Sequence, residues 1–256
     1  MDIVVRQIDQ PPQLDDHTAN KRIGLLVLST DHVTESDFAR MIPRHRIGVY
    51  VTRVPFTNPV TRDNLLAMQP SLTSAASLLL PDEPIDVVMY SCTSASVMIG
   101  DEAITKSIRI AKPEAAIVTP TVAALNALNA LDAKRISILT PYTSEVSRSM
   151  ALYFRDRGIT IDAVTCLGLT DDRVMARISH DDIVQLAQSA VAPESDALFI
   201  SCTGIRAAAA VAEIEASIGK PVVTSNLATA WTCMRLCGNN EARSSLGRLM
   251  MLSLPA

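Results

Sequence analysis

The sequence predicts an α/β protein with two lobes, each a parallel sheet flanked by helices, related by a pseudo-twofold axis. Apolar runs with the length and branching of buried parallel strands alternate with helical patterns. Segments 86–94 and 196–204 read almost alike, each an acidic residue, an apolar run and then Ser-Cys-Thr. Landmarks recur at nearly constant spacing, 113 residues from Ile23 to Ile136 and 110 from Cys92 to Cys202. Chance could give such spacing in any regular βα chain, but the shared Ser-Cys-Thr favours an internal duplication.

The elements follow from this alternation. Residues 1–20, with two adjacent prolines and many polar side chains, are expected to form a surface arm. The first lobe, 21–118, is predicted to hold strands at 23–28, 47–51, 87–90 and 116–118, and helices near 36–41, 71–80 and from 96. The second lobe, 119–225, is predicted to hold strands at 136–139, 159–164 and 197–200, and helices at 144–157 and 181–190. Residues 226–256 are expected to pack back on the first lobe.

Composition narrows the function. A net charge of -4 without a basic cluster, and 4% aromatic residues, argue against a nucleic-acid partner. We expect no signal peptide, because the first residues lack a basic region followed by a long apolar stretch, and no apolar run reaches the ~18 residues that cross a membrane. Five cysteines without the spacing of a disulfide scaffold indicate a reducing cytoplasm. Nine glycines and no phosphate loop argue against a nucleotide cofactor, so we expect no cofactor.

Cys92 and Cys202 are the candidate catalytic residues. Each is predicted to lie where a strand ends and a helix begins, which is where open α/β sheets place their chemistry. The helix dipole should favour the thiolate there. Two cysteines facing each other across the cleft between the lobes could serve both faces of a planar intermediate, or one could add to an alkene. The alternative is that they are buried packing residues, although polar neighbours flank both.

Hydroxyl groups accompany the two cysteines. Thr93, Ser94 and Thr203 are expected to offer hydroxyls and backbone N–H groups to a carboxylate or an enolate oxygen, although simple helix capping is also compatible with them. Tyr142 and Thr143, after the first strand of the second lobe, should reach the same cleft. Asp31 lies at the matching place of the first lobe.

Other reactive side chains are interpreted as structural. His32 follows the first strand, where a single histidine is more often a surface or capping residue. Cys166 has no partner motif and is expected to be a core residue. Cys233 and Cys237 have a spacing that could bind a metal, but no suitably spaced cluster accompanies them, so packing is favoured and no metal site is expected.

The paired Ser-Cys-Thr segments, Thr140-Pro141-Tyr142, Ser225-Asn226 and Ala230-Trp231 together resemble the aspartate/glutamate racemase superfamily. Within it, the chain is similar to the branch of maleate cis–trans isomerase, arylmalonate decarboxylase and the ectoine-utilisation protein. The resemblance implies two flavodoxin-like lobes, a cofactor-independent enzyme with its site at their interface, and catalysis by Cys92 and Cys202. It also implies that Tyr142 donates a hydrogen bond to the substrate and that Thr93, Ser94 and Thr203 help to bind its oxyanion.

Departures from the family pattern suggest a different substrate. Similar decarboxylases carry glycine in the first motif, so Cys92 argues for an isomerase or racemase. Maleate isomerases resembling this chain have asparagine where Asp31 lies, and an Asp-Asn pair where this chain reads Asp171-Asp172. Asp31 and Asp172 would repel a dicarboxylate but suit a substrate with ammonium groups.

Three hypotheses follow. The first is a racemase for a small amino acid such as a diaminobutyrate from ectoine breakdown. The second is a maleate cis–trans isomerase. The third is a non-catalytic sensor of small ligands. The expected ligand is therefore a small carboxylate or amino acid, with no membrane partner. The apolar residues 249–252 are compatible with internal packing or with a homo-oligomer.

Overall fold

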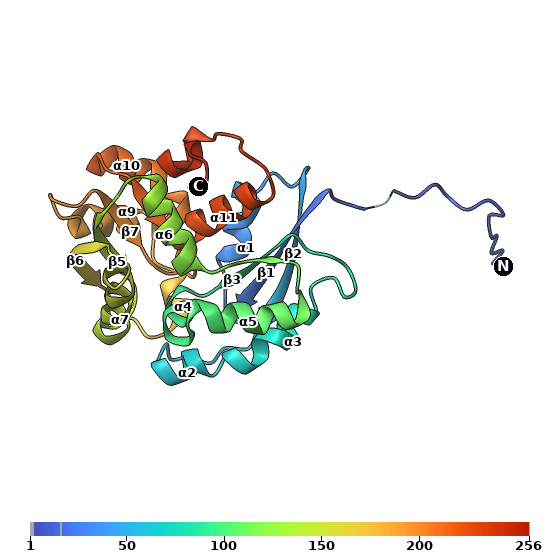
Figure 1. The fold of residues 1–256 in the computed structure, drawn as a ribbon, viewed down its shortest axis with the longest axis horizontal. Coiled ribbons are helices and arrows are strands. Elements are labelled where there is room, and N and C mark those ends of the chain that lie inside the picture. The colour runs from blue at the N-terminus through green and yellow to red at the C-terminus, as the bar shows by residue number, and fades with distance from the viewer. Residues whose placement is uncertain (1–2, 16, 256) are drawn as a thin grey trace.

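The computed structural model describes residues 3–15 and 17–255 and contains two four-stranded parallel sheets (Figure 1). The first sheet has the order β2-β1-β3-β4, with strands β1 (Lys21–Leu28), β2 (Ile47–Val54), β3 (Val87–Ser91) and β4 (Ala116–Val118). The second has the order β6-β5-β7-β8, with strands β5 (Arg135–Thr140), β6 (Thr160–Cys166), β7 (Ala197–Ile200) and β8 (Val222–Thr224). The two orders are equivalent, and the predicted fold class of paired parallel sheets is confirmed.

The burial of the strands explains their sequences. Every residue of β3 and β7 is buried, and β1 is buried from Arg22 onward, because helices cover both faces of a parallel sheet. These strands are therefore nearly continuous apolar runs without alternation. Strand β6 lies at a sheet edge, and its side chains are half-buried or exposed. Cys166, its last residue, is therefore exposed, and the expectation that it is a core residue is wrong.

Helices connect and cover the strands. The α-helices are α1 (Thr34–Met41), α2 (Arg62–Leu66), α3 (Leu72–Ser77), α4 (Thr93–Ile99), α5 (Asp101–Ala111), α6 (Pro120–Ala130), α7 (Ser144–Arg155), α8 (Asp172–Met175), α9 (His180–Ala190), α10 (Val211–Ile218) and α11 (Ser225–Leu236). The 3-10 helices are η1 (Gln69–Ser71), η2 (Arg206–Ala209), η3 (Ser244–Leu246) and η4 (Arg248–Met251).

Two helices predicted in the first lobe differ most from the structure. Of the helix expected over 71–80, only α3, residues 72–77, is α-helical, and η1 directly precedes it. The helix expected from 96 begins three residues earlier, at Thr93, and ends at Gly100, whose φ of 92° interrupts it before α5. A positive φ of this kind is readily adopted by glycine, which has no Cβ.

Helix α11 joins the two halves of the molecule. Its residues from Ser225 to Arg235 are buried, and it contacts α1, β3 and β4 of the first half as well as α6 and β8 of the second. The Trp231 ring N–H donates to the Leu252 carbonyl at 2.9 Å and so ties the C-terminal segment to this helix. The segment expected to pack on the first lobe therefore contacts both halves.

Residues 3–15 are exposed and extend away from the two sheets (Figure 1). Among the residues that the structure describes, no helix combines the length and apolar character that crossing a bilayer requires.

Candidate active site

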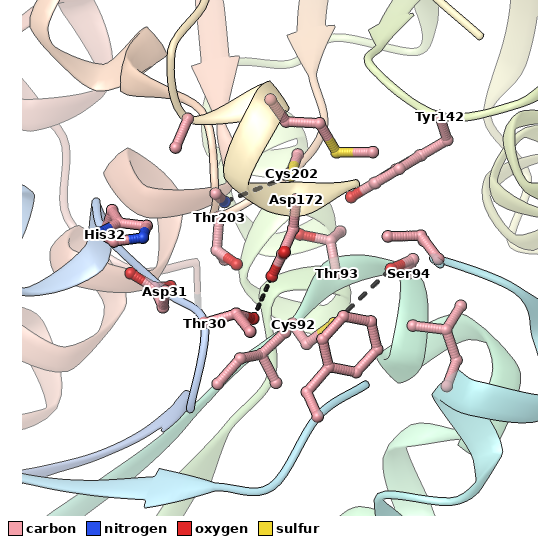
Figure 2. Close-up of a pocket in the computed structure, with 17 residues that line it drawn as sticks. Thr30, Asp31, His32, Cys92, Thr93, Ser94, Tyr142, Asp172, Cys202 and Thr203 are labelled. Carbon is pink, nitrogen blue, oxygen red and sulfur yellow. Dashed lines mark hydrogen bonds between the residues drawn. The ribbon is translucent and has the colours of Figure 1, made fainter. Parts of the chain in front are cut away.

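The two Ser-Cys-Thr segments meet at one pocket. Cys92 directly follows β3, and Cys202 lies two residues after the end of β7, the strand at the equivalent position of the second sheet. Both cysteines are buried, and both line a pocket that holds about 440 Å³ of unfilled space, part of it open to solvent. Figure 2 shows them on either side of Asp172 in this view. The pocket therefore receives one thiol from each half of the chain.

The backbones that hold the two thiols differ. Cys92 has an extended backbone, with φ of -157°, and immediately precedes α4 as predicted. Cys202 has a φ of 118°, and its Sγ accepts a hydrogen bond from the Gly204 N–H at 3.2 Å. The helix expected directly after Cys202 is absent, because the chain turns there and α10 begins only at Val211. That part of the sequence prediction is wrong.

Burial outweighs the helix N-terminus that was expected to favour the thiolates. Burial raises the pKa of Cys92 to about 11, while hydrogen bonds from Ser94 and the Ala95 backbone act in the opposite direction. Burial raises the pKa of Cys202 to about 12, against hydrogen bonds from Tyr142 and the Gly204 backbone. Removing a thiolate from water costs more than these donors return. Both side chains are therefore thiols in the free protein at neutral pH.

Hydrogen bonds fasten the two segments to each other. The Thr203 hydroxyl donates to the Ser91 carbonyl at 3.2 Å. The Ser225 hydroxyl accepts from the Thr93 hydroxyl at 2.8 Å and from the Cys202 N–H at 3.1 Å. The hydroxyl protons of both threonines are thus directed to other parts of the chain, and the threonines fix the relative positions of the two cysteines. Sequence reasoning named Ser225 only as part of a family motif.

Ser94 and Tyr142 present polar groups beside the thiols. The Ser94 hydroxyl lies 3.6 Å from the Cys92 Sγ, and both residues line the pocket (Figure 2). Burial raises the pKa of Tyr142 well above its usual value, so its phenol keeps the proton and can donate it in a hydrogen bond. Thr143 is half-buried ahead of α7 and is not one of the residues that line the pocket. The structure does not bring this candidate into the site.

Asp31 lines the pocket but has a structural task as well. Its Oδ1 accepts from the N–H groups of Val33 and Thr34, each at 2.8 Å, and its Oδ2 accepts from the Thr34 hydroxyl at 2.7 Å. These bonds satisfy the first turn of α1. Burial nevertheless raises the pKa of Asp31, which these hydrogen bonds oppose.

Asp172 is the aspartate that faces the pocket from the second half of the chain. It is 9% exposed, and its Oδ2 accepts from the Thr30 hydroxyl while its Oδ1 accepts from the Asn58 amide at 2.7 Å. Its neighbour Asp171 points elsewhere and pairs with Arg173. The choice of Asp172 over Asp171 as the pocket residue agrees with this geometry.

The pocket is lined by acidic side chains. Among its lining residues, all within the described part of the chain, are the two aspartates and the exposed His32, but no lysine or arginine. The apolar part of the wall comes from several segments, with Leu28, Phe56, Val60, Leu65 and Met175. These apolar residues were not identified from the sequence, nor were Thr30 and Asn58. They lie in loops or near the ends of helices and strands, where the spacing of apolar residues indicates no function.

Comparisons with known proteins agree with this geometry. A family model described as arylmalonate decarboxylase matches residues 70–250. Arylmalonate decarboxylase of Bordetella bronchiseptica is 34% identical over 134 residues, which span 51% of this chain and 56% of that protein. Maleate isomerase of Nocardia farcinica is 26% identical over 242 residues, 90% of this chain and 95% of that protein.

A solved structure has the same fold. It is a cysteine-to-serine mutant of Nocardia farcinica maleate cis–trans isomerase with a covalently bound succinylcysteine intermediate. It superposes with a TM-score of 0.82 at 24% identity, covering 90% of this chain and 98% of that one. The predicted branch and the expectation of an isomerase-related enzyme are confirmed. Because the family model matches well over half of its residues, the chain belongs to the arylmalonate decarboxylase family.

Proposed function

We propose that this protein is a cofactor-independent isomerase that inverts the α-carbon of a small amino acid carrying a second ammonium group. The observation that carries the proposal is a pocket with one buried thiol from each half, two aspartates and no basic lining residue. A diamino acid would place its ammonium groups toward Asp31 and Asp172. Its carboxylate would lie beside the hydroxyl groups of Ser94 and Tyr142, which also line the pocket.

The reaction would be a proton transfer across the α-carbon. One cysteine, as thiolate, removes the α-proton and becomes a thiol, and the opposite thiol donates its proton to the other face and becomes a thiolate. The Tyr142 phenol and the Ser94 hydroxyl would donate hydrogen bonds to the carboxylate oxygen on which charge develops. The raised thiol pKa values fit this task, since a rarer thiolate is also a stronger base for a weakly acidic proton.

A 2,4-diaminobutyrate of the kind formed when ectoine is broken down is the substrate we favour within this class. The two aspartates of the pocket support it, and so does the resemblance of the sequence motifs to the ectoine-utilisation protein. A cytoplasmic location and a homo-oligomeric state stay predictions.

The test is incubation with D- and L-2,4-diaminobutyrate in deuterated water. We expect deuterium at the α-carbon and conversion of each enantiomer into the other, both lost in Cys92→Ala and Cys202→Ala. Absence of α-deuterium together with turnover of maleate to fumarate would reject the proposal.

The second candidate is cis–trans isomerisation of maleate. The similarity to a maleate isomerase, 26% identical over 90% of this chain, favours it. One thiolate would add to the double bond, rotation would follow about the resulting single bond, and the thiolate would leave. The succinylcysteine adduct in the relative is consistent with such an addition. Against it, a dianion in this pocket would face two carboxylates without a basic side chain.

A further inference from the structure

A loop of the first half reaches across the pocket and holds Asp172. This loop, residues 55–61, connects β2 to α2. The Asn58 amide donates to Asp172 Oδ1 at 2.7 Å, and the Asn58 Oδ1 accepts from the Asp172 backbone N–H at 3.2 Å. The Val60 N–H donates to the Thr170 carbonyl at 2.7 Å. Side chain and backbone therefore link the two halves at the edge of the pocket.

The loop is braced within the first half. The Phe56 N–H donates to the Ser29 hydroxyl at 3.1 Å, and the Asn64 amide donates to the Pro59 carbonyl at 2.9 Å. Phe56 and Val60 form part of the pocket wall. Asn58 is therefore presented to Asp172 from a fixed support.

Both oxygens of Asp172 are bonded to the first half of the chain. Thr30 donates to Oδ2 and Asn58 donates to Oδ1, whereas Asp172 itself begins α8 in the second half. Each oxygen keeps a lone pair for another donor. Figure 2 shows the Asp172 carboxylate directed to Thr30 and into the space between the two cysteines. The donors therefore orient this carboxylate toward the position where a substrate would lie.

We infer that Asn58 is a positioning residue that aims the Asp172 carboxylate into the pocket and thereby sets its preference for cationic ligands. The inference rests on the proposed function for the identity of the ligand. A positioned carboxylate favours any small cation that enters the pocket, so this preference can be measured without turnover.

Thiol-directed reagents of opposite charge measure that preference directly. Aminoethyl methanethiosulfonate is a cation and sulfonatoethyl methanethiosulfonate an anion of similar size. Mass spectrometry of the cysteine peptides gives the rates of reaction with Cys92 and Cys202. It also separates them from the reaction of Cys166, which is exposed. We expect the wild type to react faster with the cation. In Asn58→Ala the ratio of the two rates should fall about tenfold, toward that of Asp172→Asn.

Two further variants separate positioning from folding. Asn64→Ala removes a hydrogen bond of the same loop without touching Asp172, so it should keep the wild-type ratio. Asn58→Asp with Asp172→Asn restores an amide opposite a carboxylate, so its melting temperature should exceed that of either single variant.

The inference is overturned if the wild type does not prefer the cation, or if Asn58→Ala keeps the wild-type ratio. It is also overturned if Asn64→Ala lowers the ratio as much as Asn58→Ala does, since a general loosening of the loop would then explain both. The proposed function fails on a different result, the absence of α-deuterium, which leaves the reagent ratios unaffected.

Discussion

Cys92 and Cys202 occupy equivalent places in the two sheets, yet only Cys202 has a left-handed backbone, with φ of 118° against -157° for Cys92. A residue with a Cβ adopts such a φ at a cost of about 1–3 kcal/mol, and such conformations are typical of functional sites. In the structure, the Gly204 N–H hydrogen bond to the Cys202 Sγ accompanies this conformation. The position of the Cys202 thiol is therefore determined by an unusual backbone conformation, and that of the Cys92 thiol by the junction between β3 and α4.

Glycine substitutions should expose this difference. Cys202→Gly relieves the backbone, whereas Cys92→Gly only removes a buried side chain from an extended residue. We expect the free energy of unfolding to be about 1–2 kcal/mol higher in Cys202→Gly than in Cys92→Gly. Chemical denaturation measures this directly. Equal stabilities would contradict a strained Cys202.

The raised pKa values predict how the thiols react with alkylating agents. In the free protein, thiolate forms as the pH rises toward about 11 for Cys92 and about 12 for Cys202. Carbamidomethylation of both should therefore increase about tenfold per pH unit between pH 7 and 10. Mass spectrometry of each cysteine peptide follows it. A plateau below pH 9 would show that a thiolate is already stable in the free pocket.

Tyr142 should matter for turnover more than for stability. Tyr142→Phe removes the buried phenolic donor, and we expect kcat to fall about 10²-fold, as when one oxyanion donor is lost. Tyr153→Phe is the matched control, since its hydroxyl donates to Asp101 at 2.6 Å and Tyr153 does not line the pocket. That variant should change the melting temperature and keep kcat. If Tyr142→Phe kept kcat and Tyr153→Phe lowered it, Tyr142 would have no role in the reaction.

The buried carboxyl group of Asp37, which Asn226 links to Thr203, predicts a pH dependence of stability. Burial raises the pKa of Asp37 to about 6, against hydrogen bonds and charge from Asn226 and Arg40. The Asn226 amide joins Asp37 to the Thr203 carbonyl at 2.8 and 2.9 Å.

Because the folded-state pKa is raised, the stabilisation is fully present below about pH 4 and is lost as the pH rises through about 6. The loss amounts to about 3 kcal/mol. In Asp37→Asn, the urea midpoint should change less between pH 4 and pH 8 than in the wild type. An unchanged difference would show that Asp37 does not titrate in this range.

Much of the architecture could be predicted from the sequence, because buried parallel strands are continuous apolar runs. Strands β4 and β7 have the predicted limits, and the two cysteines meet at one pocket as the repeat of Ser-Cys-Thr suggested. The predicted helix after Cys202 failed, since Thr203-Gly204 reads as a helix start but forms a turn. The positive φ of Cys202 cannot be predicted from the spacing of apolar residues in the sequence.

The partners of the site residues were beyond sequence reasoning. Asn58 and Asp172 are 114 residues apart, and Thr93 and Ser225 are 132 apart. Such contacts arise only when the two halves pack together. For the same reason Thr143, one residue from Tyr142, could not be recognised as lying outside the pocket.

The distribution of deuterium in the first turnovers tests most directly whether two opposed thiols act on one substrate. In deuterated water with L-2,4-diaminobutyrate, the D product should carry one α-deuterium while the recovered L substrate keeps its α-proton, because different sulfurs remove and deliver the proton. Deuterium entering the recovered substrate as fast as the product would mean that one base serves both faces, and would contradict the paired roles of Cys92 and Cys202.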